Sequence, residues 1–526
     1  MAVVLNRHVV LLTIAFTRFC SAGNLVSNRE HQTGDIPAIA KYFGTKTRYE
    51  EINPYLLNDI LFVNKTSLQL QQECTPVHIS AVIRHGTRYP TAKNVKMMKD
   101  IYKIATKTKR RGLGLVDDIS HWDMWYNDTM DGQLVKKGRD DHMNLAFRLA
   151  TAYPSLFTED SFRDCRMKFI TSSKHRCVDS TRSFIEGLVM KYWKMQDWRK
   201  AVHCQLEVND DLMRFFDKCE RFVVDVEENK TALQQVDLFK TKPEMQGVVD
   251  KVASLLDVAA SDITADLVEA AFYMCSYDLS IRNLKSPWCQ LFDQEDAKVL
   301  EYANDLKQYW KRGYGHEINS KSSCTLFHDL FRRLDKAVEE SERQVVLEYA
   351  NDLKQYWKRG YGHEINSKSS CTLFHDLFRR LDKAVEENSV CLCVFYRSGT
   401  VSEPAAFQIG HAETLLPLLS LMGFFKDETP LTADNFAQQG GRVFRTGHIV
   451  PYASNLVFIL HRCEGSYRLQ LLLNEKPLSF PQTDDPAPEY QHVKNLYSNL
   501  LEGCDFKKEC KLPSANGTVN PIIHEL

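Results

Sequence analysis

Arg84, His85 and Arg88 lie close together in the sequence and have the chemistry to bind and attack a phosphoryl group. Guanidinium groups bind dianionic oxyanions and disfavour protonation of a neighbouring imidazole, which leaves a neutral nitrogen able to attack phosphorus. Gly86 lets the backbone approach a ligand closely. We predict that His85 is the nucleophile and that both arginines bind the phosphate. A solvated surface cluster is the alternative, but the full R-H-G-x-R-x-P string at 84–90 is far more specific than R-H-G alone.

Two apolar runs of strand length lead into the candidate residues. Val77 to Ile83 ends where the charged motif begins, and Ala406 to Gly410 ends at His411 and Glu413, before a predicted helix. Open α/β sheets place their ligands at the carboxyl ends of strands, so we expect the two histidines to share one site. Taken alone, Glu413 would be an acid favoured by the helix dipole; beside the first motif we predict a catalytic role.

The stretch from Met167 to Arg176 predicts another short strand that runs into polar residues and then into a helix. Ser172 and Ser173 can cap that helix, whose N-terminus would then face an anion with Arg176 in its first turn. Lys174 is a candidate secondary contact, although an exposed loop position is the favoured interpretation. Thr87, inside the first motif, is a further candidate contact to substrate.

These motifs resemble the histidine acid phosphatase family. R-H-G-T-R-Y-P at 84–90, G-H-A-E-T at 410–414 and F-G-T-K-T-R-Y at 43–49 are similar to its multiple inositol polyphosphate phosphatase branch, and the resemblance runs from about Phe43 to the C-terminus. It implies an α/β fold, in which a core sheet flanked by helices carries an inserted, mainly helical cap. It also implies a reaction without cofactor or metal.

The resemblance assigns a role to each matching residue. Arg84, Arg88, Arg176 and His411 would bind the phosphate, His85 would form a phosphohistidine, and Glu413 would protonate the leaving alcohol. An alkoxide is a poor leaving group, so a carboxylic acid must protonate it and then, as carboxylate, activate water. The implied substrates are inositol hexakisphosphate and lower forms, with 2,3-bisphosphoglycerate as a further family implication.

A local excess of positive charge supports a polyphosphate substrate. The chain has a formal net charge of −1, yet residues 84–111 hold ten Lys or Arg residues against one acid, Asp100. Five lysines recur at helical spacing, namely Lys93, Lys96, Lys99, Lys103 and Lys107. We predict that Lys93 and Lys96 contact substrate; a solvated basic face is the alternative. Nucleic acid is a less suitable partner because no aromatic platform interleaves these charges and the compartment is wrong.

Two other functions stay open. A broad-specificity secreted or lysosomal-type acid phosphatase would need His85 and Glu413 but no lysine stripe. A non-catalytic glycoprotein that binds polyphosphates would need neither of these two residues.

Several features indicate the secretory pathway. Residues 1–22 resemble a signal peptide with a short apolar core and a small-residue cleavage site, although Arg18 leaves an uncleaved anchor as an alternative. No later segment is apolar enough to span a membrane. Sequons at Asn64, Asn127, Asn229 and Asn516 predict glycosylation. The C-terminal Ile523 to Leu526 is similar to a retrieval signal, which predicts a retrieval receptor and an endoplasmic reticulum or secreted location.

The 15 cysteines suit an oxidising compartment. We expect short-range bridges between Cys275 and Cys289 and between Cys504 and Cys510. Cys391 and Cys393 lack a second pair, so we predict no zinc site.

The sequence from Val299 to Glu340 recurs letter for letter at 346–387. Two identical units do not make a solenoid, so one copy must loop out and expose its apolar helix face at 326–334 or at 373–381. The sequence leaves open which copy packs. The expected organisation is a signal peptide (1–22), a first core part (23–189), a helical cap (190–387), a doubtful linker (388–405), a second core part (406–510) ending in a β-hairpin at 455–473, and a tail (511–526).

Overall fold

The computed structural model describes residues 38–68, 70, 74–107, 114–192, 206–359 and 401–513. Within these residues a seven-stranded sheet has the order β3-β2-β4-β1-β5-β6-β7. The strands are β1 (Thr75–Arg84), β2 (Met167–Thr171), β3 (Leu206–Val208), β4 (Ala405–Gly410), β5 (Asn455–Cys463), β6 (Ser466–Leu473) and β7 (Lys476–Pro477). The first four in this order run parallel, and the last three pair antiparallel. The α/β fold, the strands before both motifs and the hairpin are therefore confirmed.

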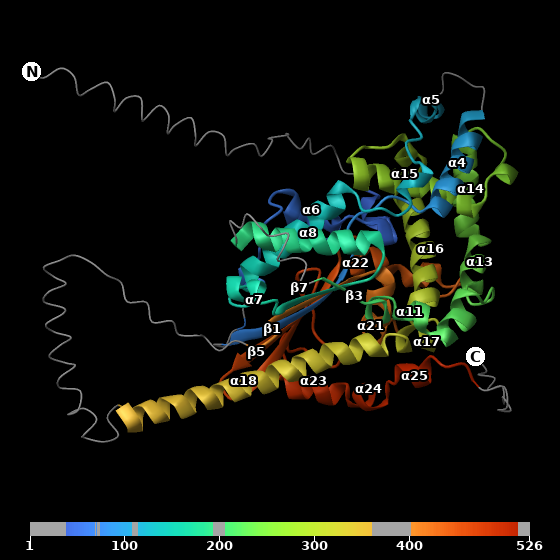
Figure 1. The fold of residues 1–526 in the computed structure, drawn as a ribbon. Helices are drawn as coiled ribbons and strands as arrows, with labels where there is room; N and C mark the ends of the chain where they lie inside the picture. Colours follow the sequence, from blue (N-terminus) through green and yellow to red (C-terminus); the bar gives the residue numbers. More distant parts are fainter. Residues whose placement is uncertain are drawn as a thin grey trace, which may run out of the picture. The chain divides into compact units, whose positions relative to one another are not determined.

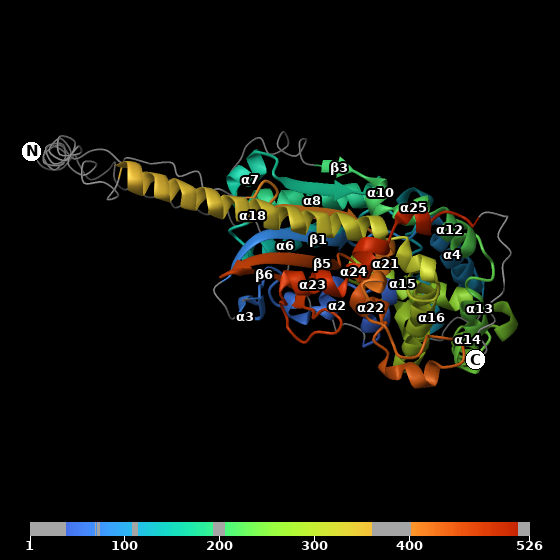
Figure 2. The same cartoon turned by 90° about the horizontal axis from the view of Figure 1, so that it is seen from below.

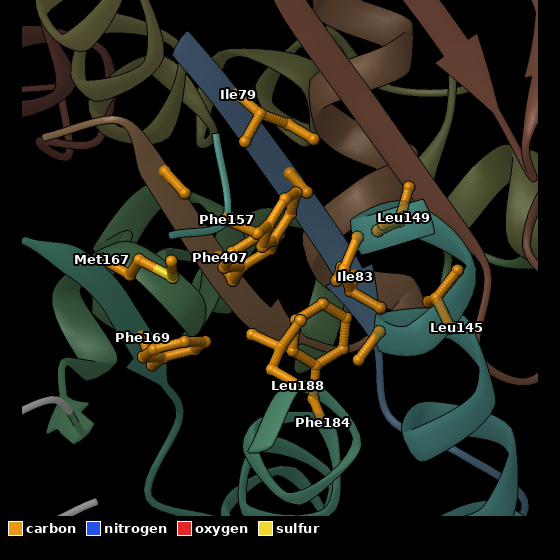
Figure 3. Packing of buried hydrophobic residues seen from close by; sticks show 14 of the residues in the cluster. Ile79, Ile83, Leu145, Leu149, Phe157, Met167, Phe169, Phe184, Leu188 and Phe407 are labelled. Atoms are coloured by element: carbon orange, nitrogen blue, oxygen red, sulfur yellow. The ribbon is translucent and has the colours of Figure 1, made fainter. Parts of the chain in front are cut away.

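One face of the sheet packs against helices α6 (Lys136–Ala152) and α8 (His175–Tyr192). Side chains alternate across a strand, so Ile79 and Ile83 of β1 point into this layer together with Phe407 of β4 (Figure 3). They meet Leu145 and Leu149 of α6, and Phe184 and Leu188 of α8. This buried apolar layer fixes the three central strands whose ends carry the predicted motifs.

The opposite face is covered by α18 (Cys324–Arg359) and α23 (Tyr490–Leu496), which lie below the sheet in Figure 1. Gln408 of β4 donates a hydrogen bond of 2.7 Å to the carboxylate of Asp329 in α18. Arg333 of α18 pairs with both Asp329 and Glu403. This polar seam places α18 directly on the strand that ends at His411.

A group of helices stands at one end of the sheet, as Figures 1 and 2 both show. It contains α4 (Ala92–Lys107), α5 (Gly114–His121), α13 (Gln234–Lys240), α14 (Pro243–Leu255), α15 (Ala265–Arg282), α16 (Gln294–Arg312) and α17 (Glu317–Lys321). The domain boundaries expected from the sequence do not coincide with the division between this group of helices and the sheet. Helix α4 packs against α15 of the inserted segment, whereas β3 and α18, both within 190–387, join and cover the sheet.

Four disulfide bonds are described, and they correct one prediction. Cys275 pairs with Cys289 as expected, but Cys504 pairs with Cys324 and Cys510 pairs with Cys219. The predicted Cys504–Cys510 bridge is wrong because α25 (Phe506–Glu509) separates the two residues and each meets a different distant segment. The fourth bond joins Cys74 and Cys463.

The first copy of the repeat is the one that packs. It forms most of α16, all of α17 and the start of α18, and its apolar residues Leu326, Phe327, Leu330, Phe331 and Leu334 are buried. The second copy begins within α18, which runs on past the sheet (Figure 2). Its residues 360–387, including the apolar stripe at 373–381, lie outside the described residues, as do the signal peptide, most of the linker, Asn516 and the C-terminal tetrapeptide.

Candidate active site

Three neighbouring parallel strands end side by side and deliver the candidate residues. The backbone N–H of His85, just after β1, donates to the carbonyl of Gly410 at the end of β4, at 2.9 Å. The N–H of Ser172, just after β2, donates to the carbonyl of Ile409 at 3.2 Å. The ring centroids of His85 and His411 are 5.6 Å apart. The structure therefore brings together two histidines that lie far apart in the sequence.

The loop after β1 is clamped against α6. A Cβ atom at Gly86 would lie 2.2 Å from the carbonyl oxygen of Gly138, so only glycine allows this approach. Gly86 donates its N–H to the Ser180 hydroxyl at 3.1 Å. Thr87 is fully buried and donates its hydroxyl to Asp141 at 3.2 Å, which places this side chain in the clamp rather than in open contact with substrate.

His85 is held as a neutral base. Its Nδ1 lies 2.9 Å from the carbonyl oxygen of Gly86, which can only accept, so Nδ1 carries the proton and Nε2 keeps its lone pair. Burial first, and then the charges of Arg176, Arg84 and Arg88, hold the pKa of His85 well below its usual range. The lone pair at Nε2 is available for attack on phosphorus.

His411 has the opposite tautomer. Arg176 donates from Nη2 to Nδ1 of His411 at 3.3 Å, so Nε2 carries the proton and donates to the Ser172 hydroxyl at 2.9 Å. Burial and the charge of Arg176 hold the pKa of His411 well below its usual range. Ser172 and Arg176, from the ends of β2 and α8, thus fix the ring that β4 delivers.

Four arginines present unused donors at the site. The Nε atoms of Arg84, Arg88, Arg176 and Arg312 are buried and have no hydrogen-bond partner among the described residues. Arg84 is anchored by donating Nη1 to the carbonyls of Thr45 at 2.8 Å and Val450 at 2.5 Å. Buried donors without acceptors are costly, and an oxyanion between these side chains would satisfy them.

Glu413 lies in the first turn of α21 (Ala412–Leu421). Its Oε1 is 3.4 Å from Nη2 of Arg312. Burial alone would raise the pKa of Glu413, but Arg312, and after it His411 and Arg176, lower it well below the usual range. At neutral pH this carboxyl group is therefore ionised.

The sequence did not single out several residues of the site. Arg312 comes from the first copy of the repeat, and the guanidinium of Arg84 lies over the ring of Tyr452 at 4.7 Å. Burial and the charges of Arg88, Lys307 and Arg84 lower the pKa of Lys46 to about 7. Lys46 was within reach of sequence reasoning, because it belongs to the F-G-T-K-T-R-Y motif.

The lysine stripe does not join this cluster. Lys93 and Lys96 are exposed on α4, and Lys99 pairs with Asp128. Lys174 is also exposed. None of the described contacts connects these side chains to the histidine pair. No group of three or more His, Cys, Asp or Glu residues in the described part of the chain could hold a metal ion.

The chain matches the histidine phosphatase superfamily (branch 2) over residues 77–347 and 339–474. It is 44% identical to multiple inositol polyphosphate phosphatase 1 of Homo sapiens, covering 92% of both chains. The protein of that name from Gallus gallus is 43% identical, covering 91% of this chain and 94% of the relative.

Two solved structures share the fold. The phytase from D. castellii has a TM-score of 0.60 at 15% identity and covers 92% of each chain. A Bifidobacterium longum multiple inositol polyphosphate phosphatase, in complex with inositol hexasulfate, has a TM-score of 0.59 at 13% identity and covers 88% of this chain and 97% of its own. The chain therefore belongs to the histidine phosphatase superfamily (branch 2) and, within it, to the family of the multiple inositol polyphosphate phosphatases.

Proposed function

We propose that this chain hydrolyses inositol polyphosphates, inositol hexakisphosphate and its lower forms, through a phosphohistidine on His85. One observation carries the proposal. The free Nε2 of His85 lies among the charges of Arg176, Arg84 and Arg88, whose buried Nε donors have no partner among the described residues, so the site combines a nucleophile with donors that suit an oxyanion.

The reaction has two steps. In the first, Nε2 of His85 bonds to phosphorus while the bond from phosphorus to the leaving oxygen breaks, and protonated Glu413 gives its proton to that oxygen. In the second, the Glu413 carboxylate takes a proton from water, and the water oxygen bonds to phosphorus as the P–N bond breaks. Inorganic phosphate leaves, and both side chains return to their starting states.

The excess of positive charge favours a substrate with several phosphates. Besides Arg84, Arg88 and Arg176, the basic side chains Lys46, Arg214 and Lys307 act electrostatically on members of the site. One phosphate does not need all of these charges, and the Lys46 ammonium has no described ion pair with a carboxylate. The names of the relatives support the same substrate class.

The test measures phosphate release from inositol hexakisphosphate with a chelator present. His85→Ala should lower kcat by about 1,000-fold or more, because the nucleophile is lost. His121→Ala, at an exposed histidine of α5, is the matched control and should leave kcat unchanged. Alkaline quenching followed by mass spectrometry should find one phosphoryl group on the peptide that contains His85. A phosphoryl group found on a peptide without His85 would refute the mechanism. Full activity in His85→Ala would refute it as well.

We also propose that the protein enters the secretory pathway, loses residues 1–22 and is glycosylated, with the C-terminal tetrapeptide binding a retrieval receptor. Asn64, Asn127 and Asn229 are exposed, which supports glycosylation at these sequons, and the described disulfides suit an oxidising compartment. Among the described residues, no helix has the length and apolar character needed to cross a membrane. N-terminal sequencing and a glycosidase mobility shift of protein from secreting cells test this; an intact Met1 and no shift would refute it.

A further inference from the structure

The proposed proton donor is ionised while it pairs with Arg312. Glu413 must carry a proton before it can protonate the leaving alcohol, yet the groups that face it are mainly cationic. They are Arg312 from α16, His411 beside it on the same turn, Arg176 and Cys177 from α8, Arg84 at the end of β1 and Arg88 from the loop that follows. Of the charged groups that lower its pKa, Arg312 has the largest effect. Some event between binding and reaction must therefore allow Glu413 to take up a proton.

Arg312 is the cation best placed to change partner. Its Nη2 is 3.4 Å from Glu413 and its Nη1 is 3.7 Å from Glu227, so both ion pairs are long. Lys311 holds Glu227 more closely, at 2.7 Å. The buried Nε of Arg312 has no hydrogen-bond partner among the described residues. Nη1 also donates to the Lys311 carbonyl at 3.4 Å, so the guanidinium has a free Nε donor and three long contacts, at the end of a helix.

Two aromatic rings guide this side chain. The guanidinium carbon of Arg312 lies 6.0 Å from the ring centroids of both Phe216 and Phe222. Phe216 also meets the ring of His411 edge-on, with centroids 6.4 Å apart. Arg312 is therefore held beside the histidine pair and can turn toward an anion there without leaving its apolar support.

We infer that Arg312 is a specificity-determining residue that pairs with Glu413 before substrate binds and transfers to a second phosphate of a polyphosphate substrate, which frees Glu413 to take up a proton. The inference rests on the proposed function and deepens it. The proton comes from solvent to the Glu413 carboxylate, and passes to the leaving oxygen as the P–O bond breaks and the bond to Nε2 of His85 forms. A substrate with one phosphate offers Arg312 no second anion.

The unmodified protein gives the first test. We expect the basic limb of the kcat profile to lie at higher pH for inositol hexakisphosphate than for glycerol 2-phosphate, a monophosphate with a poor leaving group. The separation should be about one pH unit, because an ion-pair partner within about 4–6 Å typically shifts a carboxyl pKa by at least that amount. Coincident basic limbs would overturn the inference without any substitution.

Variants locate the effect in Arg312. Arg312→Gln should move the basic limb for glycerol 2-phosphate to higher pH and lower the ratio of kcat/KM for hexakisphosphate to that for glycerol 2-phosphate by about ten-fold, since a charge-assisted contact is lost. Arg312→Lys should restore part of this ratio. Arg359→Gln, at the identical position of the second copy, is the matched control and should change neither quantity.

The outcomes separate this inference from the function beneath it. If the unmodified chain releases no phosphate from inositol hexakisphosphate, the proposed function fails. If it does release phosphate, the inference alone is refuted when Arg312→Gln lowers kcat/KM equally for both substrates and leaves the basic limbs of both pH profiles unchanged. Arg312 would then only support the structure.

Discussion

The segment VLEYANDLKQYWKR occurs at 299–312 and again at 346–359, and its two copies lie in opposite surroundings. Both are helical, in α16 and in the end of α18. Tyr302 is 0% exposed and donates its hydroxyl to Thr432 and Asn435, whereas its twin Tyr349 is 67% exposed. Local sequence therefore decides that both copies form a helix. Burial is decided by the cradle, which is the packing site around α16 and holds one copy.

The flanking residues explain why the first copy occupies the cradle. Asp293 caps α16 in a capping box with Asp296, and Ala297 is 0% exposed. Before the second copy, the positions of Asp296 and Ala297 hold Arg343 and Gln344. In the cradle, the second copy would lose the cap and bury a long polar side chain.

The largest difference in unfolding free energy is expected between substitutions of Asp305 and of Asp352, the same position in the second copy. Asp305 is fully buried and binds Arg442 at 2.6 Å and the Thr446 N–H at 2.9 Å. Asp305→Ala leaves Arg442 poorly paired in the interior and should cost about 3–5 kcal/mol of unfolding free energy. Asp352→Ala, on the exposed end of α18, should stay within about 0.5 kcal/mol. Denaturant titration measures both, and equal losses would mean that either copy can pack.

Leucine truncation sharpens the same contrast. Leu306 is 0% exposed and Leu353 is 39% exposed. Leu306→Ala opens a cavity and should cost about 2–5 kcal/mol, whereas Leu353→Ala should cost well under about 1 kcal/mol. A denaturation midpoint that falls equally in both variants would contradict the assignment of the cradle to the first copy.

A third substitution places before the first copy a residue that precedes the second copy. Ala297→Gln should cost about 1–3 kcal/mol, because the fully buried site has no room or partner for the amide. Ala350→Gln on the exposed part of α18 is the control. Thermal unfolding is the measurement; an unchanged midpoint in Ala297→Gln would remove the physical reason for preferring the first copy.

The smallest effect should follow removal of one copy. Deleting 341–387 gives the same chain as deleting 299–345, so one variant tests both. Ser402 donates to the Glu340 carboxylate at 2.7 Å, so the intervening segment returns close to where it left. The shorter loop should raise the unfolding free energy by only about 1 kcal/mol and leave phosphate release intact. A large loss of stability would show that the extra segment supports the fold.

Features carried by consecutive residues were predictable from the sequence. The strands before His85 and His411, the hairpin and the Cys275–Cys289 bridge all depend on local patterns, and the structure confirms them. The meeting of the two histidines followed from one general rule, that parallel strands end at a common edge.

Contacts between distant segments were not predictable in this way. The partners of Cys504 and Cys510 come from far along the chain, and no spacing rule identifies them. Arg312 reaches Glu413 because α16 occupies its cradle, and Lys46 nears the arginines from the N-terminal segment. The substrate contacts of Lys93 and Lys96 stay predictions, because helical spacing gives a shared face but not the direction in which that face points.

The most direct test compares matched charge removals in the two copies. Lys307→Ala with Arg312→Ala should lower kcat/KM for inositol hexakisphosphate by about 100-fold, since two contacts to a polyanion are lost. Lys354→Ala with Arg359→Ala, the same pair in the second copy, should leave it unchanged. Equal losses from the two pairs, or a loss only from the second, would show that the first copy does not complete the site.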